Sequence, residues 1–311
     1  MKKISVVIPT YNRAENLKMS LTALLEQDFS IDDYEIIVIN DGSTYSIDTT
    51  IAGLSNNTSS IRIYNQEHRG PGPARNLGIK ESTGEIILFV GDDIVSSRRL
   101  LREHFEWHQK FKEENIAVLG FVSWSSDIKI TPFMKWIESN GLQFAYPLIK
   151  NCGDLGFKFF YTANISVKRR FFLKNNLFFD EQFKHAAFED TELGYRFCKI
   201  GGKIVYNKNA IGYHYHPITF SSFCLRTKYA IRSAILFSQK WPGVISLPQV
   251  ENRTKFNYLK SLLKKVFYPI IRKFIDFIDM IDISPCIGLY QRLLDYYSVN
   301  ELKKCCQLKN E

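Results

Sequence analysis

The sequence predicts an α/β fold in which helices cover both faces of a Rossmann-like, mostly parallel sheet, followed by a helical C-terminal extension. Three observations carry this prediction. Short apolar runs recur near the N-terminus, amphipathic segments separate them, and each run ends in a polar turn. Later in the chain, apolar residues recur at helical spacing instead. We therefore expect a sheet domain over residues 1–235 and a helical extension over 236–311.

The first part of the chain alternates between predicted strands and helices. Apolar, β-branched runs indicate buried strands, and leucines three or four residues apart indicate one face of a helix. Residues 120–220 are less regular and rich in Phe and Tyr, so we expect them to complete the same domain. The expected strands cover 4–8, 35–39, 61–64 and 85–90, and the expected helices cover 15–27 and 73–80.

Composition excludes several classes of protein. With 311 residues, 45% of them hydrophobic, the chain can bury a large core and is not disordered as a whole. Its net charge of +9 favours an anionic partner. The six cysteines form no Cys-x-x-Cys unit, which favours a reduced, cytoplasmic protein over a zinc protein. The apolar run at the N-terminus is too short for a signal peptide, and no stretch is long enough for a membrane span.

Polar clusters follow three of the predicted strands. In an open parallel sheet, ligands bind beyond the carboxyl ends of the strands, where such clusters meet. We therefore expect a site for a polar, metal-associated ligand at this edge. The clusters are Thr10-Tyr11-Asn12, Asp41-Gly42-Ser43 and Asp92-Asp93.

Two acidic pairs stand out, and each has an ordinary explanation beside a functional one. Asp92 and Asp93 offer hard oxygen ligands for Mg²⁺ or Mn²⁺, but Gly-Asp-Asp is also common turn chemistry. Glu189 and Asp190 could supply a general base, or they could simply be the acidic first turn of a helix.

The histidines are ambiguous in the same way. His214 and His216 alternate along a predicted strand, so both could face one metal or phosphate, or one could be buried and hydrogen-bonded. His104 and His108 are four residues apart without the glutamate of a zinc-protease helix, so we expect them on a helix surface. The segment 70–76 lacks the glycines of a dinucleotide loop and the lysine of a P-loop, which disfavours both cofactor types.

In their order and spacing, these motifs resemble the successive signatures of family 2 glycosyltransferases with the GT-A fold. The resemblance covers about residues 3–230 and implies inverting transfer of a sugar from a nucleotide-diphosphate sugar to a saccharide or lipid-linked acceptor, in cell-surface glycan synthesis. Residues 1–120 would form the donor half and 121–235 the acceptor half. A non-catalytic nucleotide-sugar or glycan-binding protein is the alternative. The matching segments are 8–12, 40–43, 73–78, 91–93, 163–164, 179–181, 189–190 and His214.

The resemblance also implies roles for single residues. Asp190, supported by Glu189, would be the catalytic base, and Mg²⁺ or Mn²⁺ would be bound by Asp93 and His214, with His216 as a substitute. Gly91 replaces the first acid of the family's Asp-x-Asp motif, so Asp92 would take over part of its role. The donor would be held by Pro9, Thr10, Tyr11, Asn12, Asp41, Arg75 and Asp92. The candidate acceptor contacts, in part because aromatic rings stack on sugars, are Trp124, Tyr161 and Asn164.

Residues after 240 lie outside the resemblance. Every charge between residues 253 and 273 is basic, apolar residues recur at helical spacing up to Ile281, and Pro269 is expected to kink or break the helix. The stretch 253–281 could lie on an anionic membrane surface, making the protein peripheral on the inner face of the cell membrane. Alternatively, it could pack on the catalytic domain with its charges in solvent. No motif supports nucleic-acid binding.

Overall fold

The computed structural model describes residues 2–54, 58–247, 255–283 and 287–307, without the side chains of 255–266, 287, 306 and 307. The chain forms two compact units. The first comprises residues 1–128 and 144–216, and the second comprises 129–143 and 217–311. The division thus falls at residue 216, not at the expected 235, and a segment from the middle of the chain joins the C-terminal helices.

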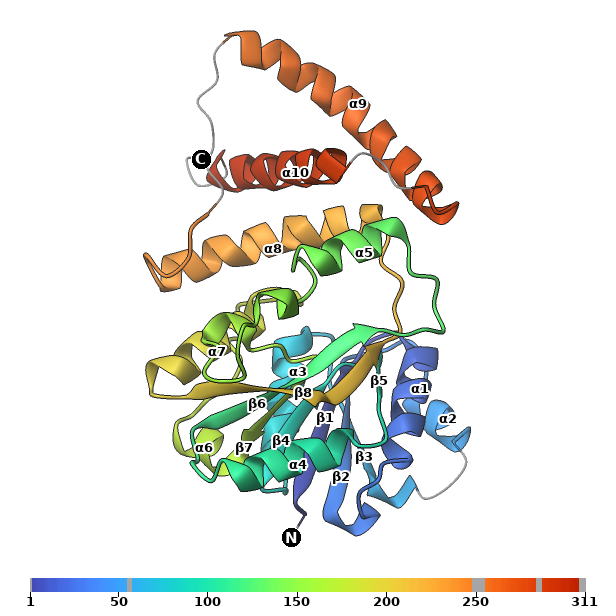
Figure 1. Ribbon diagram of the computed structural model, residues 1–311, viewed down its shortest axis with the longest axis vertical. Coiled ribbons are helices and arrows are strands. Elements are labelled where there is room, and N and C mark those ends of the chain that lie inside the picture. The colour runs from blue at the N-terminus through green and yellow to red at the C-terminus, as the bar shows by residue number, and fades with distance from the viewer. Residues whose placement is uncertain (1, 55–57, 248–254, 284–286, 308–311) are drawn as a thin grey trace. The chain divides into compact units, whose positions relative to one another are not determined.

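The first unit is built on one eight-stranded sheet with the order β3-β2-β1-β4-β7-β6-β8-β5 (Figure 1). Strands β3, β2, β1 and β4 are parallel, whereas β7 is antiparallel to both of its neighbours. Strand β8 is parallel to β6 and antiparallel to β5. The strands are β1 (Ile4–Thr10), β2 (Tyr34–Asn40), β3 (Ile61–Asn65), β4 (Ile86–Val90), β5 (Ile94–Ser96), β6 (Ile116–Trp124), β7 (Asn164–Lys168) and β8 (Lys203–His214).

Helices cover both faces of this sheet because alternate strand residues point to opposite sides. Ile4, Val6 and Ile8 of β1 belong to a buried cluster with α1 and α4, whereas Val7 belongs to a cluster with α3, α6 and α7. A Cβ atom at Gly78 would lie 2.3 Å from Val7, so glycine lets α3 approach the sheet closely. The helices are α1 (Ala14–Leu25), α2 (Ile47–Ala52), α3 (Pro71–Glu81), α4 (Leu100–Lys110), α6 (Arg169–Lys174) and α7 (Glu189–Lys199). Short 3-10 helices cover Ile31–Asp33, Thr58–Ser60, Tyr146–Leu148 and Phe157–Phe159.

The predicted fold class is confirmed. The six elements expected in the first part of the chain are β1, α1, β2, β3, α3 and β4, and each begins and ends within two residues of its expected bounds. The sheet is more mixed than expected, since its parallel character is interrupted at β7 and β5.

The second unit consists of α5 (Pro132–Ser139), α8 (Phe220–Lys240), α9 (Lys255–Met280) and α10 (Ile287–Gln307). Phe133 explains why α5 belongs here: its ring lies 5.1 Å from that of Phe220 and 5.2 Å from that of Tyr290. Helix α9 continues through Pro269, so of the expected kink or break the break does not occur. We attribute this continuity to packing, because Ile275 and Ile278 beyond the proline are buried. Among the described residues, no helix is both long and apolar enough to cross a membrane.

Candidate active site

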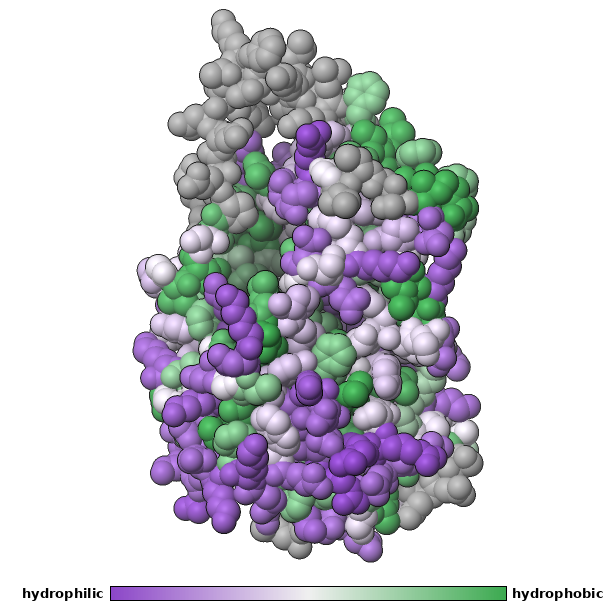
Figure 2. Space-filling model, viewed as in Figure 1, coloured by the Kyte–Doolittle hydropathy of each residue, from purple (hydrophilic) through white to green (hydrophobic). Residues whose placement is uncertain are grey.

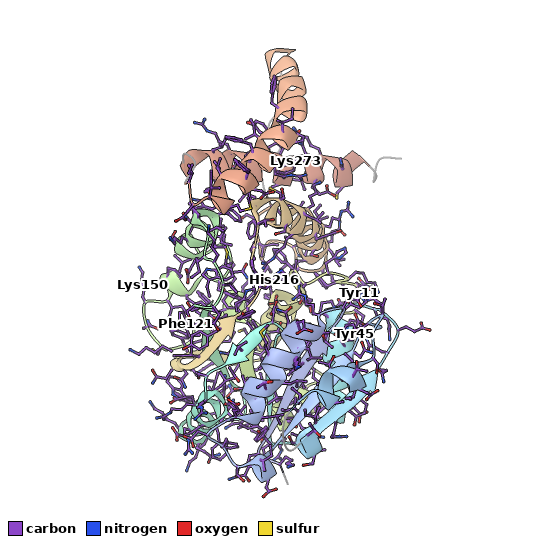
Figure 3. The ribbon with its side chains drawn as sticks, turned by 90° about the vertical axis from the view of Figure 1, so that its right-hand side faces the viewer. Tyr11, Tyr45, Phe121, Lys150, His216 and Lys273 are labelled. Carbon is purple, nitrogen blue, oxygen red and sulfur yellow. The ribbon has the colours of Figure 1, made fainter. Side chains whose placement is uncertain are left out.

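The site lies at the carboxyl ends of the parallel strands. Strands β1, β2 and β4 run in the same direction, so the loops after Thr10, Asn40 and Val90 leave the sheet at one edge. Figure 3 shows Tyr11 and His216 at this end of the sheet. Pro9 lies within β1, opposite Ile39 of β2.

The Asp92–Asp93 pair forms the centre of this edge. The Thr10 hydroxyl donates to Asp92 Oδ2 at 2.8 Å. The Arg13 guanidinium binds both carboxylates through Nη1, which lies 2.6 Å from Asp93 Oδ2 and 3.3 Å from Asp92 Oδ1. His214 Nε2 lies 3.4 Å from the same Asp93 oxygen.

The pKa values of these two carboxyls shift in opposite directions. Burial raises the pKa of Asp92, and the neighbouring Asp93 adds to this effect. Burial would also raise the pKa of Asp93, but His214 and Arg13 outweigh it and hold that pKa below its usual range. Asp93 is therefore the more readily ionised member, and Asp92 is held in position by its hydrogen bond from Thr10.

Backbone pairing carries His214 to Asp93. His214 pairs with Ile94 in the β5–β8 ladder, and the Tyr215 N–H donates to the Asp93 carbonyl at 2.8 Å. The ring of Trp124 packs edge-on at 5.2 Å from the His214 ring. The His216 ring lies 6.1 Å from the His214 ring, so the predicted metal candidates are neighbours.

The chemistry of these side chains fits a divalent cation. Asp93 supplies a carboxylate and His214 an imidazole, donors that suit Mn²⁺, and Asp93 alone would suit Mg²⁺. Nδ1 of His214 is buried without a hydrogen-bond partner in the part of the chain that the structure describes. That part contains no cluster of three or more acidic, His or Cys side chains able to hold a metal.

A second cluster surrounds Asp41. Its carboxylate accepts the backbone N–H groups of Arg69 and Gly70 at 2.9 Å each and the Gln66 amide at 2.6 Å, while His68 Nδ1 lies 2.9 Å away. Three donors and the His68 imidazole surround this carboxylate, so a further hydrogen bond to Asp41 would compete with Gln66 or His68.

An aromatic ring borders this cluster. Tyr11 is 42% exposed and stacks on His68 with ring centroids 3.9 Å apart. Asn12 adopts φ 54° and fastens the loop after β1 to the loop after β2: its N–H donates to Ser43 Oγ, and its Oδ1 accepts from the Thr44 N–H. Flat aromatic surface beside a hydrogen-bonding carboxylate is suited to a base.

Glu189 and Asp190 form a third cluster at the start of α7. Arg75 of α3 donates from Nη1 to Glu189 Oε1 at 2.9 Å, and both side chains are nearly fully buried. Burial raises the pKa of Glu189, the neighbouring Asp190 raises it further, and Arg75 opposes both. Glu189 and Arg75 thus form a buried ion pair that joins the start of α7 to α3.

Asp190 is the partly exposed member of the pair. Its Oδ1 accepts the Thr191 N–H at 2.7 Å. Burial raises the pKa of Tyr161 to about 12, and the negative charge of Asp190 adds to this effect. Phe188, directly before the pair, has φ 67°, a left-handed conformation that is unusual for a bulky residue.

Two expectations about buried polar residues need correction. Asn164 is fully buried, and its amide donates to the Ala210 and Phe121 carbonyls while Oδ1 faces His104 Nε2 at 2.8 Å. Its side chain is therefore committed to the interior and does not reach an acceptor. His104 and His108 are buried against Ser166, not on the helix surface, and burial lowers their pKa values to about 4 and about 3.

Arg13 and His68 are site residues that sequence reasoning missed. Arg13 directly follows the polar cluster after β1, so its position beside two strand-end acids was a usable signal. His68 lies in a loop with no recognisable pattern, and only the fold reveals its contact with Asp41.

Comparisons with known proteins agree with this architecture. The family model described as "Glycosyl transferase family 2" matches residues 5–189. An Escherichia coli chondroitin synthase is 26% identical over 243 residues, covering 69% of this chain and 35% of its own length. The chain spans as little as 18% of the length of other curated relatives.

Two solved structures share the fold. Staphylococcus aureus TarS 1–349 in complex with UDP superposes with a TM-score of 0.57 at 15% identity, covering 98% of this chain and 91% of that one. The mannosyltransferase PcManGT from Pyrobaculum calidifontis, in complex with GDP-Man and Mn²⁺, gives a TM-score of 0.57 at 15% identity, covering 96% and 87%. Taken with the family match over more than half of its residues, the strand-end clusters and the GT-A architecture identify this chain as a member of glycosyltransferase family 2.

Proposed function

We propose that this protein is an inverting glycosyltransferase that moves a sugar from a nucleotide-diphosphate sugar to an acceptor hydroxyl. One observation carries the proposal. Asp190, a partly exposed carboxylate, lies in the first turn of α7, directly after Glu189, which is paired with Arg75. It belongs to the same unit as the strand-end clusters of Asp41 and Asp93. A protein that only binds a nucleotide sugar has no use for a placed base.

The donor would lie along the strand ends. Tyr11 and Asp41 would hold the base and ribose, with Gln66 or His68 giving way to the base. Thr10 and Asp92 are bonded to each other and would line the floor of the diphosphate site. Asp93 and His214 would hold Mg²⁺ or Mn²⁺, which when bound neutralises charge on the departing nucleoside diphosphate.

Asp190 would act on the acceptor. A carboxylate beside the attacking hydroxyl accepts its proton as the oxygen bonds to the anomeric carbon from the face opposite the leaving diphosphate, which inverts the configuration. The charge of Asp190 acts on the pKa of Tyr161, and the aromatic ring of Tyr161 would pack on the acceptor. Trp124 packs on His214 and would instead support the cation site.

The largest expected effect on activity is that of D190N. General-base assistance contributes about 10²- to 10⁴-fold in rate, so transfer should fall by at least about 100-fold. Calorimetric titration of UDP, GDP, CDP and dTDP, each with and without Mn²⁺, should identify one nucleotide that D190N binds as tightly as the wild type does.

D154N is a matched control. Asp154 is a loop carboxylate that accepts the Gly156 N–H, and an amide oxygen can keep that contact. Its transfer rate should stay within about twofold of wild type. Loss of nucleotide binding in D190N would indicate a structural role for Asp190 and contradict the proposed base.

The biological acceptor is proposed from the relatives. The curated matches include a chondroitin synthase and a poly(ribitol-phosphate) β-N-acetylglucosaminyltransferase, TarS of Staphylococcus aureus. Both names refer to a polymer, chondroitin in one and poly(ribitol-phosphate) in the other. We propose an acceptor of the same kind, a growing glycan or a lipid-linked saccharide.

We also propose that α9 attaches the protein to an anionic membrane surface. Its described part exposes five large apolar side chains at helical spacing, and Figure 2 shows hydrophobic surface at this place. They are Phe267, Ile270, Phe274, Phe277 and Met280. Of the basic residues predicted to contact lipid, Arg253 lies outside the described residues, and the side chains of Lys255, Lys260, Lys264 and Lys265 are not described.

Vesicle flotation tests this attachment. Wild-type protein should float with anionic vesicles at low salt, and F274E, which places a charge in the apolar stripe, should reduce the floated fraction at least severalfold. L225E, at an exposed apolar position on α8, serves as the control and should float like the wild type. Failure of the wild-type protein to float would contradict the attachment.

A further inference from the structure

Arg13 lies beside the proposed cation site, in contact with Asp93. It is the residue before the first turn of α1, and its Nη1 atom lies 2.6 Å from Asp93 Oδ2. The same oxygen faces His214 Nε2 at 3.4 Å. The guanidinium therefore contacts the same Asp93 oxygen that faces His214, the other proposed ligand of the cation.

A guanidinium and a divalent cation cannot share that oxygen without cost. Like charges a few ångströms apart repel strongly where water is partly excluded, and Asp93 is only 13% exposed. The proposed protein ligands of the cation are Asp93 and His214, and Arg13 already contacts the first of them. A cation arriving alone would have to displace Arg13 from Asp93.

The exposures show which group can move. The Arg13 side chain is 40% exposed, whereas the Asp92 side chain is 9% exposed and bonded to Thr10. Both contacts of Arg13 with the pair use Nη1 alone, and a guanidinium carries five N–H donors in a planar fork that matches phosphate oxygens. A diphosphate could therefore draw Arg13 away from Asp93 while the aspartates stay in place.

We propose that Arg13 is a positioning residue that couples cation binding to donor binding. It neutralises Asp92 and Asp93 while the donor is away, competes with the cation for Asp93, and turns to the diphosphate when donor and cation arrive together. This inference rests on the proposed donor site. Cation affinity should accordingly be low alone and high with a nucleoside diphosphate, and Arg13 should account for part of that difference.

The test is a Mn²⁺ titration followed by the paramagnetic resonance signal of free Mn²⁺. Wild type, R13Q, R13K and R102Q are each titrated alone and with whichever of UDP, GDP, CDP and dTDP binds the wild type best. Arg102 is the matched control because its side chain is 39% exposed and pairs with Asp28, away from the site.

R13Q should bind Mn²⁺ alone at least about tenfold more tightly than wild type, because a positive charge next to the site is gone. The gain in Mn²⁺ affinity caused by the nucleotide should be at least about tenfold smaller in R13Q, and by reciprocity so should the gain in nucleotide affinity caused by Mn²⁺. R13K keeps the charge but not the fork, so its coupling should fall at least about threefold. R102Q should match the wild type.

Two outcomes overturn different statements. Equal Mn²⁺ affinity and equal coupling in wild type and R13Q, with nucleotide bound by both, would overturn the role of Arg13 and leave the proposed function standing. Absence of nucleotide binding in all four proteins, with or without Mn²⁺, would overturn both. If circular dichroism shows that R13Q is unfolded, R13K decides, and coupling equal to wild type then refutes the proposal.

Discussion

The site contains two pairs of consecutive acidic residues, and an arginine from another segment of the chain binds each pair. Asp92 and Asp93 are held by Arg13, and Glu189 is held by Arg75 beside Asp190. The side chain of Arg13 is 40% exposed, whereas that of Arg75 is 9% exposed. The same ion pairing thus serves two purposes: Arg75 belongs to the fixed frame, and Arg13 stands where a ligand can replace it.

Stability should separate the two arginines most clearly. R75M leaves Glu189 buried without its cation, and breaking a buried pair in this way should lower the free energy of unfolding by about 3 kcal/mol. R13M removes a cation that is itself 40% exposed, and it leaves Asp92 with Thr10 and Asp93 with His214, so its loss should be smaller, about 1–2 kcal/mol. Urea unfolding at pH 7 measures both, and equal losses would contradict the distinction between frame and movable cation.

The titration of Glu189 gives a smaller and more specific test. Its raised pKa means that the folded protein keeps a proton that the unfolded chain releases near pH 4.5. Wild-type stability should therefore fall as the pH rises from about 4.5 towards the folded pKa, at up to about 1.4 kcal/mol per unit, and E189Q should lack this contribution.

The measurement is the difference in unfolding free energy between E189Q and wild type at pH 5 and pH 6.5. We expect E189Q to gain on wild type by about 1–2 kcal/mol over this interval. D92N should show the same sign, because burial raises the pKa of Asp92 too. A constant difference for E189Q across the interval would mean that Glu189 is ionised throughout and that Arg75 dominates its environment.

The polar residues at the carboxyl ends of the strands could be located from the sequence, whereas the buried polar residues of the interior could not. The apolar runs 4–8, 35–39 and 85–90 mark buried strands directly, and parallel strands bring their ends together, so the acids after those runs could be placed on one edge. Spacing along the chain was sufficient for this part of the site.

The four-residue spacing of His104 and His108 correctly implied a shared helix face but not which face is buried. That depends on Asn164 and Ser166, which lie about 60 residues further along the chain and reach α4 only through the sheet. The positions of Arg13 and His68 likewise depend on loops meeting in space. Local pattern carries no information about such long-range contacts.

Phe188 makes the segment before Asp190 a place where local preference and the fold disagree. A left-handed backbone at a bulky residue costs about 1–3 kcal/mol that glycine would not incur. Selection for thermal tolerance alone would therefore favour glycine or asparagine at this position. Such a change would also free the peptide that precedes Asp190, the proposed base, so we expect heat resistance gained at this position to reduce the rate of the proposed transfer.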